Sequence, residues 1–328
     1  MADVARLAGV SHQTVSRVIN DSEHVREETR ERVLVAMRQL NYRPNTVARA
    51  LVTGRSRTLG VVSFDTTLYG PASTLFAIEQ AAHDAGYFIT IASLKALDRP
   101  SVLEAVERMR RQGVDGILVI APQESAARAL AQTPAGVPLV AVEAGPTDAV
   151  PVAAVDQFAG AASATRHLLD LGHRTVWHIA GPLDWLEAQR RVAGWRATLQ
   201  AAGAPVPEPL VGDWSPRTGY DLGRRLAADR EVTAIFVAND QMALGVLRAL
   251  HEAGRAIPGD VSVVGFDDIP EAPFFTPPLT TVRQDFGEMG RRSLRLLLDT
   301  MHSAGGPPPQ FEVTPELIVR ESTAKPSA

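Results

Sequence analysis

Short apolar runs that alternate with helical patterns fill the chain from residue 59 onward. Each run has the length and β-branched composition of a buried strand, and the segment after it repeats its apolar residues at helical spacing. The runs are LGVVSF, YFITIAS, DGILVI and PLVAV in the first half, then TVWHIAG, TAIFVAND and VSVVGFDD in the second. Because strand–helix–strand repeats build parallel sheets covered by helices, we expect an α/β body of two doubly wound lobes.

The composition excludes several classes of protein. The chain has 328 residues, is 45% hydrophobic and contains no cysteine, which rules out disulfides, thiolate metal sites and a cysteine nucleophile. No apolar run reaches the ~18 residues of a membrane span, and the N-terminus does not resemble a signal peptide. We therefore expect a globular, cytoplasmic protein with no membrane partner.

Catalytic motifs are also missing from the sequence. We find no G-x-G-x-x-G, no phosphate-binding G-x-x-x-x-G-K-[ST], no G-x-S-x-G elbow and no histidine pair at zinc-protease spacing. The expectation is a protein that is not an enzyme and uses no cofactor and no metal.

Positive charge is concentrated at one end of the chain. Residues 1–60 hold ten Arg, no Lys and six acidic residues, a net charge of +4, whereas the remainder carries 23 basic and 31 acidic residues, a net charge of −8. Arginine without lysine suits bidentate contacts to phosphate or guanine, so this bias gives weak support to nucleic-acid binding.

The segment VARLAGVSHQTVSRVIN, residues 4–20, predicts two short helices joined at Gly9, the second capped by Ser11. On a helical projection one arc of the second helix is polar: His12, Gln13, Ser16, Arg17 and Asn20. An ordinary solvated face favours Lys and Glu, whereas these side chains, with Ser11, are of the kind that pairs with base edges in the major groove. We therefore expect a helix-turn-helix DNA reader rather than a helical hairpin that only packs on the body.

Apolar positions on three helices are expected to share one small core. They are Val4, Leu7 and Ala8 in the first helix, Val15, Val18 and Ile19 in the second, and Val33, Val35, Met37 and Leu40 in the third.

A further short helix is expected after Pro44, which ends the third helix. Asn45 would cap it, and Leu51 would lie on its apolar stripe. It is either a linker helix packed on the body or a hinge that folds on DNA, with Leu51 entering the minor groove as a wedge.

The motifs DVARLAGVSHQTVSRVIN, NYRPNTVARAL, GRSRTLGVV, VANDQMALG, SVVGFDD and PPLTTVRQDF resemble the signature of the LacI/GalR family of bacterial transcription regulators. The resemblance covers essentially the whole chain. It implies a three-helix DNA-binding domain at 1–43, a hinge at 44–57 and a periplasmic-binding-protein-like body at 58–328. Lobe 1 of the body would comprise about 58–156 and 284–312, and lobe 2 about 157–283 and 313–328.

Ligands of doubly wound sheets bind beyond the carboxyl ends of the strands. The polar residues at those positions are Asp65, Glu143, Asn239, Asp240, Asp267 and Asp268. Carboxylates and amides without a metal-binding cluster suit a polyhydroxylated ligand, and Trp214 could stack on a sugar ring. For Asp240 and Asp268 we favour a simpler role, capping the helices that follow them.

The family resemblance implies an effector pocket. Residues carried over by position are Leu68, Gly70 and Pro71 at an apolar lip, Arg191, Asn239 and Asp267 as polar contacts, and Trp214, Gln284 and Phe286 as wall and closure. Glu143 and Glu187 stand at positions where the family pattern has Asp and Ser. Because these differences change the acids in the pocket, the identity of the sugar stays open. Trp185, Trp195, His173 and His178 have no such match and are interpreted as packing or surface residues.

The resemblance implies a repressor that binds pseudo-palindromic operator double-stranded DNA as a homodimer. A galactoside-like sugar between the lobes would lower its operator affinity. A nucleoside or purine effector, or a corepressor that tightens binding, remains open within the family. Two other classes remain as alternatives, a solute-binding receptor and a sugar-modifying enzyme. We expect a dimer because the C-terminal heptad helix of tetrameric members has no counterpart here.

Overall fold

The computed structural model describes residues 1–19, 24–42, 54–94, 98–130, 136–145, 147–302 and 308–327. The chain divides into two compact units, Met1–Ser56 and Arg57–Ala328, and each is described by itself. Asn20, Asn45 and Leu51 lie outside the described residues, so their predicted roles at the DNA stay predictions.

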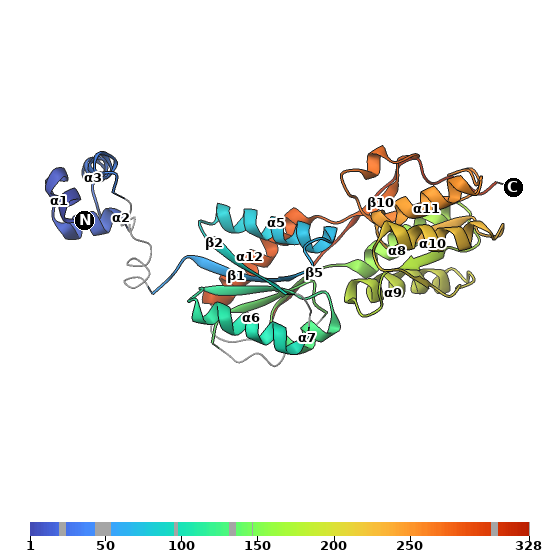
Figure 1. Ribbon diagram of the computed structural model, residues 1–328, viewed down its shortest axis with the longest axis horizontal. Helices are drawn as coiled ribbons and strands as arrows, with labels where there is room; N and C mark the ends of the chain where they lie inside the picture. Colours follow the sequence, from blue (N-terminus) through green and yellow to red (C-terminus); the bar gives the residue numbers. More distant parts are fainter. Residues whose placement is uncertain are drawn as a thin grey trace. The chain divides into compact units, whose positions relative to one another are not determined.

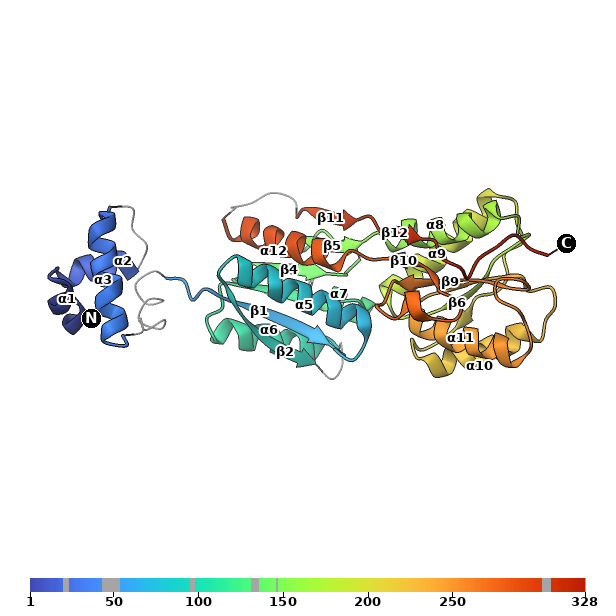
Figure 2. The ribbon, with the colours of Figure 1, turned by 90° about the horizontal axis from the view of Figure 1, so that it is seen from above.

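The described residues of the first unit form three short helices (Figure 2): α1 (Ala2–Ala8), α2 (His12–Ile19) and α3 (Glu27–Gln39). Their shared core consists of Val4, Ala5, Ala8, Val15, Val18, Val33 and Ala36. Gly9 ends α1 with φ +62°, a conformation that suits glycine. The Oγ of Ser11 accepts a hydrogen bond of 3.1 Å from the backbone N–H of Thr14. The predicted turn and cap are thus confirmed.

Three predicted core positions in this unit are wrong. Leu7, Val35 and Leu40 are 51%, 36% and 43% exposed, while the small residues Ala5 and Ala36 are buried. The buried side of α1 is centred among Val4, Ala5 and Ala8, so Leu7 lies to one side of it. Val35 lies on the face of α3 opposite Val33, and Leu40 follows the last helical residue, Gln39.

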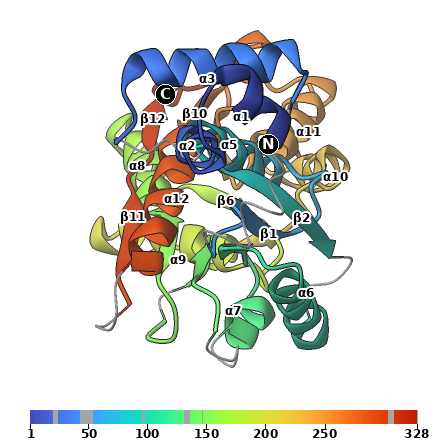
Figure 3. The ribbon, with the colours of Figure 1, turned by 90° about the vertical axis from the view of Figure 1, so that its left-hand side faces the viewer.

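The first sheet of the body has the strand order β2-β1-β3-β4-β5-β11, and each neighbouring pair is parallel. Its strands are β1 (Thr58–Phe64), β2 (Phe88–Leu94), β3 (Gly116–Ile120), β4 (Leu139–Val142), β5 (Val152–Val155) and β11 (Gln310–Val313). One face is covered by α5 (Tyr69–Asp84) and α12 (Phe286–His302), the other by α6 (Arg99–Arg111) and α7 (Glu124–Leu130) (Figure 3). We call this part the first lobe.

The second sheet repeats this arrangement in the order β7-β6-β8-β9-β10-β12, with only β12 antiparallel to its neighbour. Its strands are β6 (Trp177–Ala180), β7 (Leu210–Val211), β8 (Ala234–Val237), β9 (Ser262–Asp267), β10 (Thr280–Arg283) and β12 (Glu316–Ile318). Helices α8 (Gln157–Asp170) and α9 (Leu186–Ala201) cover one face, α10 (Pro216–Ala227) and α11 (Asp240–Glu252) the other. A short 3₁₀ turn, Ala272–Phe274, precedes β10. This second lobe confirms the predicted two-lobed α/β fold.

The chain crosses between the lobes three times, after β5, after β10 and after β11 (Figure 1). A backbone contact also joins them: Gln123 forms an antiparallel bridge with Trp185, and the N–H of Leu186 donates to the carbonyl of Pro122 at 2.8 Å. Within the described part of the chain, no helix is both long and apolar enough to span a membrane.

Candidate functional site

A cavity that opens to solvent lies where the two lobes meet, with about 320 Å³ of empty space when part of that solvent is included. The first lobe contributes Leu68, Gly70 and Pro71, at the start of α5 beyond the carboxyl end of β1. The remaining lining residues are Trp185, Glu187, Arg191, Trp214, Asn239, Asp267 and Gln284. Ligands bind at this edge of doubly wound sheets, so the position of the cavity follows from the fold. The structure thus brings together nine of the eleven residues predicted for the effector, all except Glu143 and Phe286.

The side chain of Arg191, which lines the cavity, is held in one orientation by several contacts. This residue of α9 is 1% exposed, and its Nε donates to Oε1 of Gln157 at 2.8 Å. Its Nη1 donates to the carbonyl of Ala238, and the guanidinium lies over the ring of Phe266 at 3.8 Å from the centroid. A buried guanidinium held on three sides presents its remaining donor, Nη2, in a fixed direction.

Asp267, the last residue of β9, is the final acceptor in a chain of hydrogen bonds that runs from Arg191 through two glutamines. Gln284 Nε2 donates to Asp267 Oδ1 at 2.7 Å, and Gln157 Nε2 donates to Gln284 Oε1 at 2.9 Å. Burial raises the pKa of Asp267 to about 7, against the opposing effects of Arg191 and Gln284. The carboxyl group therefore titrates near neutral pH.

Two tryptophans form the aromatic wall of the cavity. The rings of Trp185 and Trp214 meet edge to face with centroids 5.7 Å apart. The indole Nε1–H of Trp214 is buried and has no partner among the described residues, so it is a donor available to a ligand. Trp185 was expected to be a packing or surface residue. It lies in this wall because it precedes α9, two residues before Glu187.

Left-handed backbone conformations occur around the cavity. Glu143, Trp214 and Asp267 have φ values of +58°, +72° and +108°. Such conformations are costly for residues other than glycine and persist where the surrounding structure imposes them, often at functional sites.

Glu143 follows β4 of the first lobe and is not among the lining residues, but the charges of Glu187 and Arg191 in the second lobe act on it. Glu143 is 5% exposed; its Oε2 accepts a 3.4 Å hydrogen bond from the N–H of Val155, while Oε1 has no partner in the described structure. Burial, reinforced by Glu187, raises the pKa of Glu143 to about 8, and burial also raises the pKa of Glu187.

The helix cap after β8 is Asn239, whose Oδ1 accepts from the N–H of Met242 at 3.0 Å. The capping roles predicted for Asp240 and Asp268 are wrong. Asp240 is the first residue of α11, and its carboxylate accepts from the Ile269 N–H and the Thr281 hydroxyl. Asp268 accepts from Arg283 and Arg320. Both carboxylates follow buried strands and therefore have partners on neighbouring strands and loops.

Phe286 lies outside the cavity lining. It begins α12 and packs edge-on against Tyr69, with the ring centroids 5.7 Å apart. Tyr69 is flanked by the cavity residues Leu68 and Gly70, so Phe286 supports the lip of the cavity through a neighbour.

The DNA-facing arc predicted for α2 is solvent accessible. His12, Gln13 and Arg17 are exposed, Ser16 is half-buried, and Val15 and Val18 on the other side are in the core. The helix therefore separates a polar outer side from an apolar inner side, as a helix presented to DNA requires.

Residues 1–45 match the description "Bacterial regulatory proteins, lacI family", and residues 165–323 match "Periplasmic binding protein-like domain". The chain is 33% identical to the HTH-type transcriptional repressor PurR of Mannheimia succiniciproducens over 98% of both chains. It is 36% identical to the lactose operon repressor of Escherichia coli over 90% of this chain and 83% of that one.

Solved structures agree with these relatives. The lac repressor dimer bound to operator and the anti-inducer ONPF matches with a TM-score of 0.87 at 33% identity, over 98% of each chain. The complex of the transcriptional regulator CelR with cellobiose matches with a TM-score of 0.72, also at 33% identity over 98% of each chain. Since relatives above 30% identity align over nearly the full length of both chains, the chain belongs to the LacI family of bacterial transcriptional repressors.

Proposed function

We propose that the protein is an operator-binding repressor whose DNA affinity is lowered by a small sugar bound in the cavity between the lobes. The polar lining supports this proposal: Arg191 and Asp267 offer a fixed donor and acceptor side by side, and Trp214 offers an apolar wall and a free indole N–H. Hydroxyl groups both donate and accept hydrogen bonds, so they suit such a mixed set. The CelR complex supplies a precedent in which a relative holds a sugar.

The positions of Gln157 and Gln284 are the observation on which the proposal rests. Gln157 is the first residue of α8, after the crossover from β5, and Gln284 follows β10, before the crossover to α12. Both bond to the polar pair at the cavity, Arg191 and Asp267. A ligand that binds Arg191 and Asp267 can therefore shift Gln157 and Gln284, which lie at two of the three connections between the lobes. Lobe orientation is then the two-state element through which the ligand acts.

On the DNA side, we assign base reading to Gln13 and Arg17 of α2, with His12 setting a neighbouring preference and Ser11 and Ser16 flanking them. Amide and guanidinium groups form bidentate contacts with adenine and guanine edges. Asn20, Asn45 and Leu51 complete the predicted DNA-binding set.

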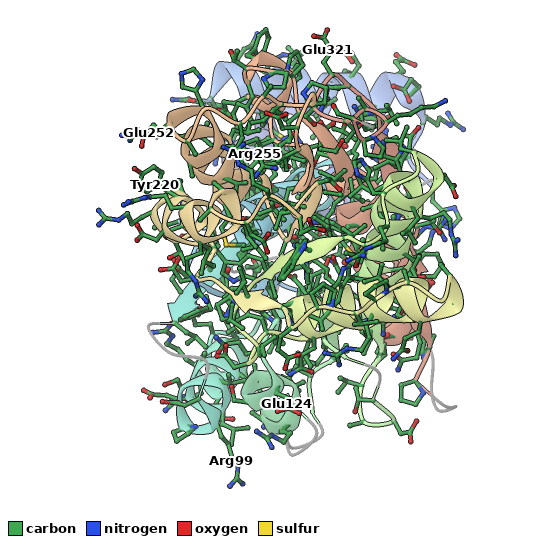
Figure 4. The ribbon with its side chains drawn as sticks, turned by 90° about the vertical axis from the view of Figure 1, so that its right-hand side faces the viewer. Arg99, Glu124, Tyr220, Glu252, Arg255 and Glu321 are labelled. Carbon is green, nitrogen blue, oxygen red and sulfur yellow. The ribbon has the colours of Figure 1, made fainter. Side chains whose placement is uncertain are left out.

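We also infer a two-fold homodimer, for which the lac repressor dimer is the precedent. Phe76 on α5 is 65% exposed above a groove lined by Tyr69, Ala72 and Phe286, and Leu244 on α11 is 44% exposed. Near Leu244, the Tyr220 hydroxyl of α10 donates to Glu252 of α11 at 2.5 Å, and Figure 4 shows these two side chains at the same edge of the second lobe. An exposed apolar surface of this kind on each lobe is typical of surfaces covered in an assembly.

A screen tests the sugar proposal. Thermal shift over galactosides, glucosides, pentoses and nucleosides should identify a stabilising sugar, since a ligand at ~100 times its Kd adds ~2.7 kcal/mol. That sugar should then lower operator affinity and remain chemically unchanged. If only nucleosides stabilise the protein, the effector is a nucleoside and not a sugar. If the stabilising ligand tightens operator binding, it is a corepressor.

A further inference from the structure

The charges at the cavity are unbalanced. Two acidic residues, Glu187 and Asp267, line it, and a third, Glu143, is close enough for the charge of Glu187 to raise its pKa. Arg191 is the one cation among the lining residues that the structure describes. Its Nη2 is 3.8 Å from Asp267 Oδ1 and 3.9 Å from Glu187 Oε2, distances longer than a hydrogen bond. One guanidinium thus faces three carboxyl groups without a close ion pair to any of them.

Arg191 cannot move closer to these acids without losing other bonds. Its Nε is held by Gln157, its Nη1 by the carbonyl of Ala238, and its plane rests on Phe266. The pKa values of Glu143, Glu187 and Asp267 are all raised, with burial as the largest cause in each case. The single charge of Arg191, which lowers the pKa of each acid, therefore does not offset the burial of three carboxyl groups.

Two buried polar atoms at the site have no partner within the described chain. They are Oε1 of Glu143, an acceptor when ionised, and Nε1–H of Trp214, a donor. The acceptor belongs to a residue that interacts electrostatically with the lining residues Glu187 and Arg191, and the donor belongs to the aromatic wall. Carboxylates beside tryptophan rings form a favourable environment for an organic cation, which gains both charge pairing and cation–π attraction.

Resting on the proposed function, that this cavity holds the effector, we propose that the effector carries a protonated amine beside its hydroxyl groups. The amine faces Glu187, whose charge also acts on Glu143, and the hydroxyls face Asp267, Arg191 and the indole of Trp214. Anionic sugars, such as sugar phosphates and uronates, are disfavoured because they would add a negative charge to a site where Asp267 already ionises near pH 7.

Matched sugars test the proposal on the full-length protein. Calorimetric titrations compare glucose, galactose and mannose with their 2-amino and 6-amino counterparts, each pair differing only in one hydroxyl or ammonium group. N-acetylated forms serve as neutral controls of similar size. We expect at least one amino sugar to bind about tenfold more tightly than its hydroxyl partner, equivalent to about 1.4 kcal/mol. N-acetylation should remove this preference.

Charge-neutral variants test whether the preference for amino sugars comes from Glu187 and Glu143. Glu187→Gln and Glu143→Gln should each reduce the ratio of amino-sugar to sugar affinity. Glu107→Gln removes the same charge from an exposed position on α6 and should leave the ratio unchanged. A preference that persists in both cavity variants would overturn the assignment.

The outcomes separate this inference from the proposed function. If neutral sugars bind as tightly as amino sugars and release the operator, the inference of an amine in the effector is wrong. The proposal of a sugar-responsive repressor would still stand. If no sugar of either kind binds or changes operator affinity, both proposals fail.

Discussion

At the level of single residues, buried acids make the stability of the body depend on pH. Glu143 has an ordinary pKa of 4.5 and a folded-state pKa of about 8, so between these values the folded state binds its proton more tightly than the unfolded state does. Stability therefore falls as pH rises from about 4.5 to 8. Asp267, raised from 3.8 to about 7, adds a loss of the same sign over a slightly lower range.

Glu143→Gln should remove part of this loss. In thermal unfolding near about pH 9 the variant should melt several degrees above the wild type, at about 2–4 °C for each kcal/mol. The difference should shrink towards about pH 5, where the wild-type carboxyl is protonated in the fold. Glu107→Gln is the exposed control and should show no such trend. A Glu143→Gln advantage that did not change with pH would contradict the raised pKa.

Arg17→Ala in α2 should weaken operator binding by ~1–3 kcal/mol and relax the preference at one base position. Arg38→Ala, an exposed arginine of α3 outside the polar arc, is the matched control and should keep the base preference. Binding-site selection on both variants decides the assignment. The same selected operator at the same affinity for Arg17→Ala would show that α2 is not the reading helix.

Several site residues could be predicted from the sequence for a physical reason. Asn239 and Asp267 follow strongly apolar runs, and the carboxyl ends of parallel strands share one edge, so both could be placed at a common site. Trp185 could not be found this way, since it follows β6 by five residues and reaches the wall through a loop. Asp240 and Asp268 show a further limit: their partners, Thr281 and Arg320, come from sequence-distant strands and loops.

At the level of elements, close contact between α8 and α9 holds the cavity residues in position. A Cβ added at Gly194 of α9 would lie 2.3 Å from the backbone carbonyl oxygen of Phe158 on α8. Only glycine allows this approach, and α9 also carries Glu187 and Arg191.

Gly194→Ala should therefore cost ~1–3 kcal/mol of stability and weaken effector binding, because α9 must shift away from α8. Arg196→Ala, an exposed change two residues further along α9, should be near neutral in both respects. Chemical denaturation and ligand titration measure the two effects. A stable Gly194→Ala protein with normal ligand affinity would show that α9 has room to move.

The longer strands were predictable and the shorter ones were not. Stretches such as GILVI in β3 and VVGF in β9 are buried on both faces and therefore contain no polar side chain. β7 has two residues and β12 has three, and both lie at sheet edges where little of the strand is buried. Neither the length nor the burial of such strands leaves a readable pattern.

At the level of the whole molecule, the dimer surface should be sensitive to charge. Phe76→Glu and Leu244→Glu should each shift the protein towards monomer in analytical ultracentrifugation, because a carboxylate would have to be buried in the interface. Phe88→Glu is the control, since Phe88 is 71% exposed on β2, away from both surfaces. Unchanged association of both Phe76→Glu and Leu244→Glu would place the dimer interface elsewhere.

Coupling between the cavity and the operator is the central claim about the molecule. Allosteric coupling is reciprocal, so a sugar that lowers operator affinity must bind the operator-bound protein more weakly, typically by ~1–3 kcal/mol. Asp267→Ala removes the acceptor to which Gln284 donates at the cavity, while the helices to which we assign DNA reading belong to a separate compact unit.

The most direct test is to measure operator affinity against rising concentrations of the stabilising sugar, for wild type and Asp267→Ala side by side. The wild type should lose affinity as sugar is added, whereas Asp267→Ala should bind operator normally without sugar and fail to release it. An equal response of the two proteins to sugar would contradict the account.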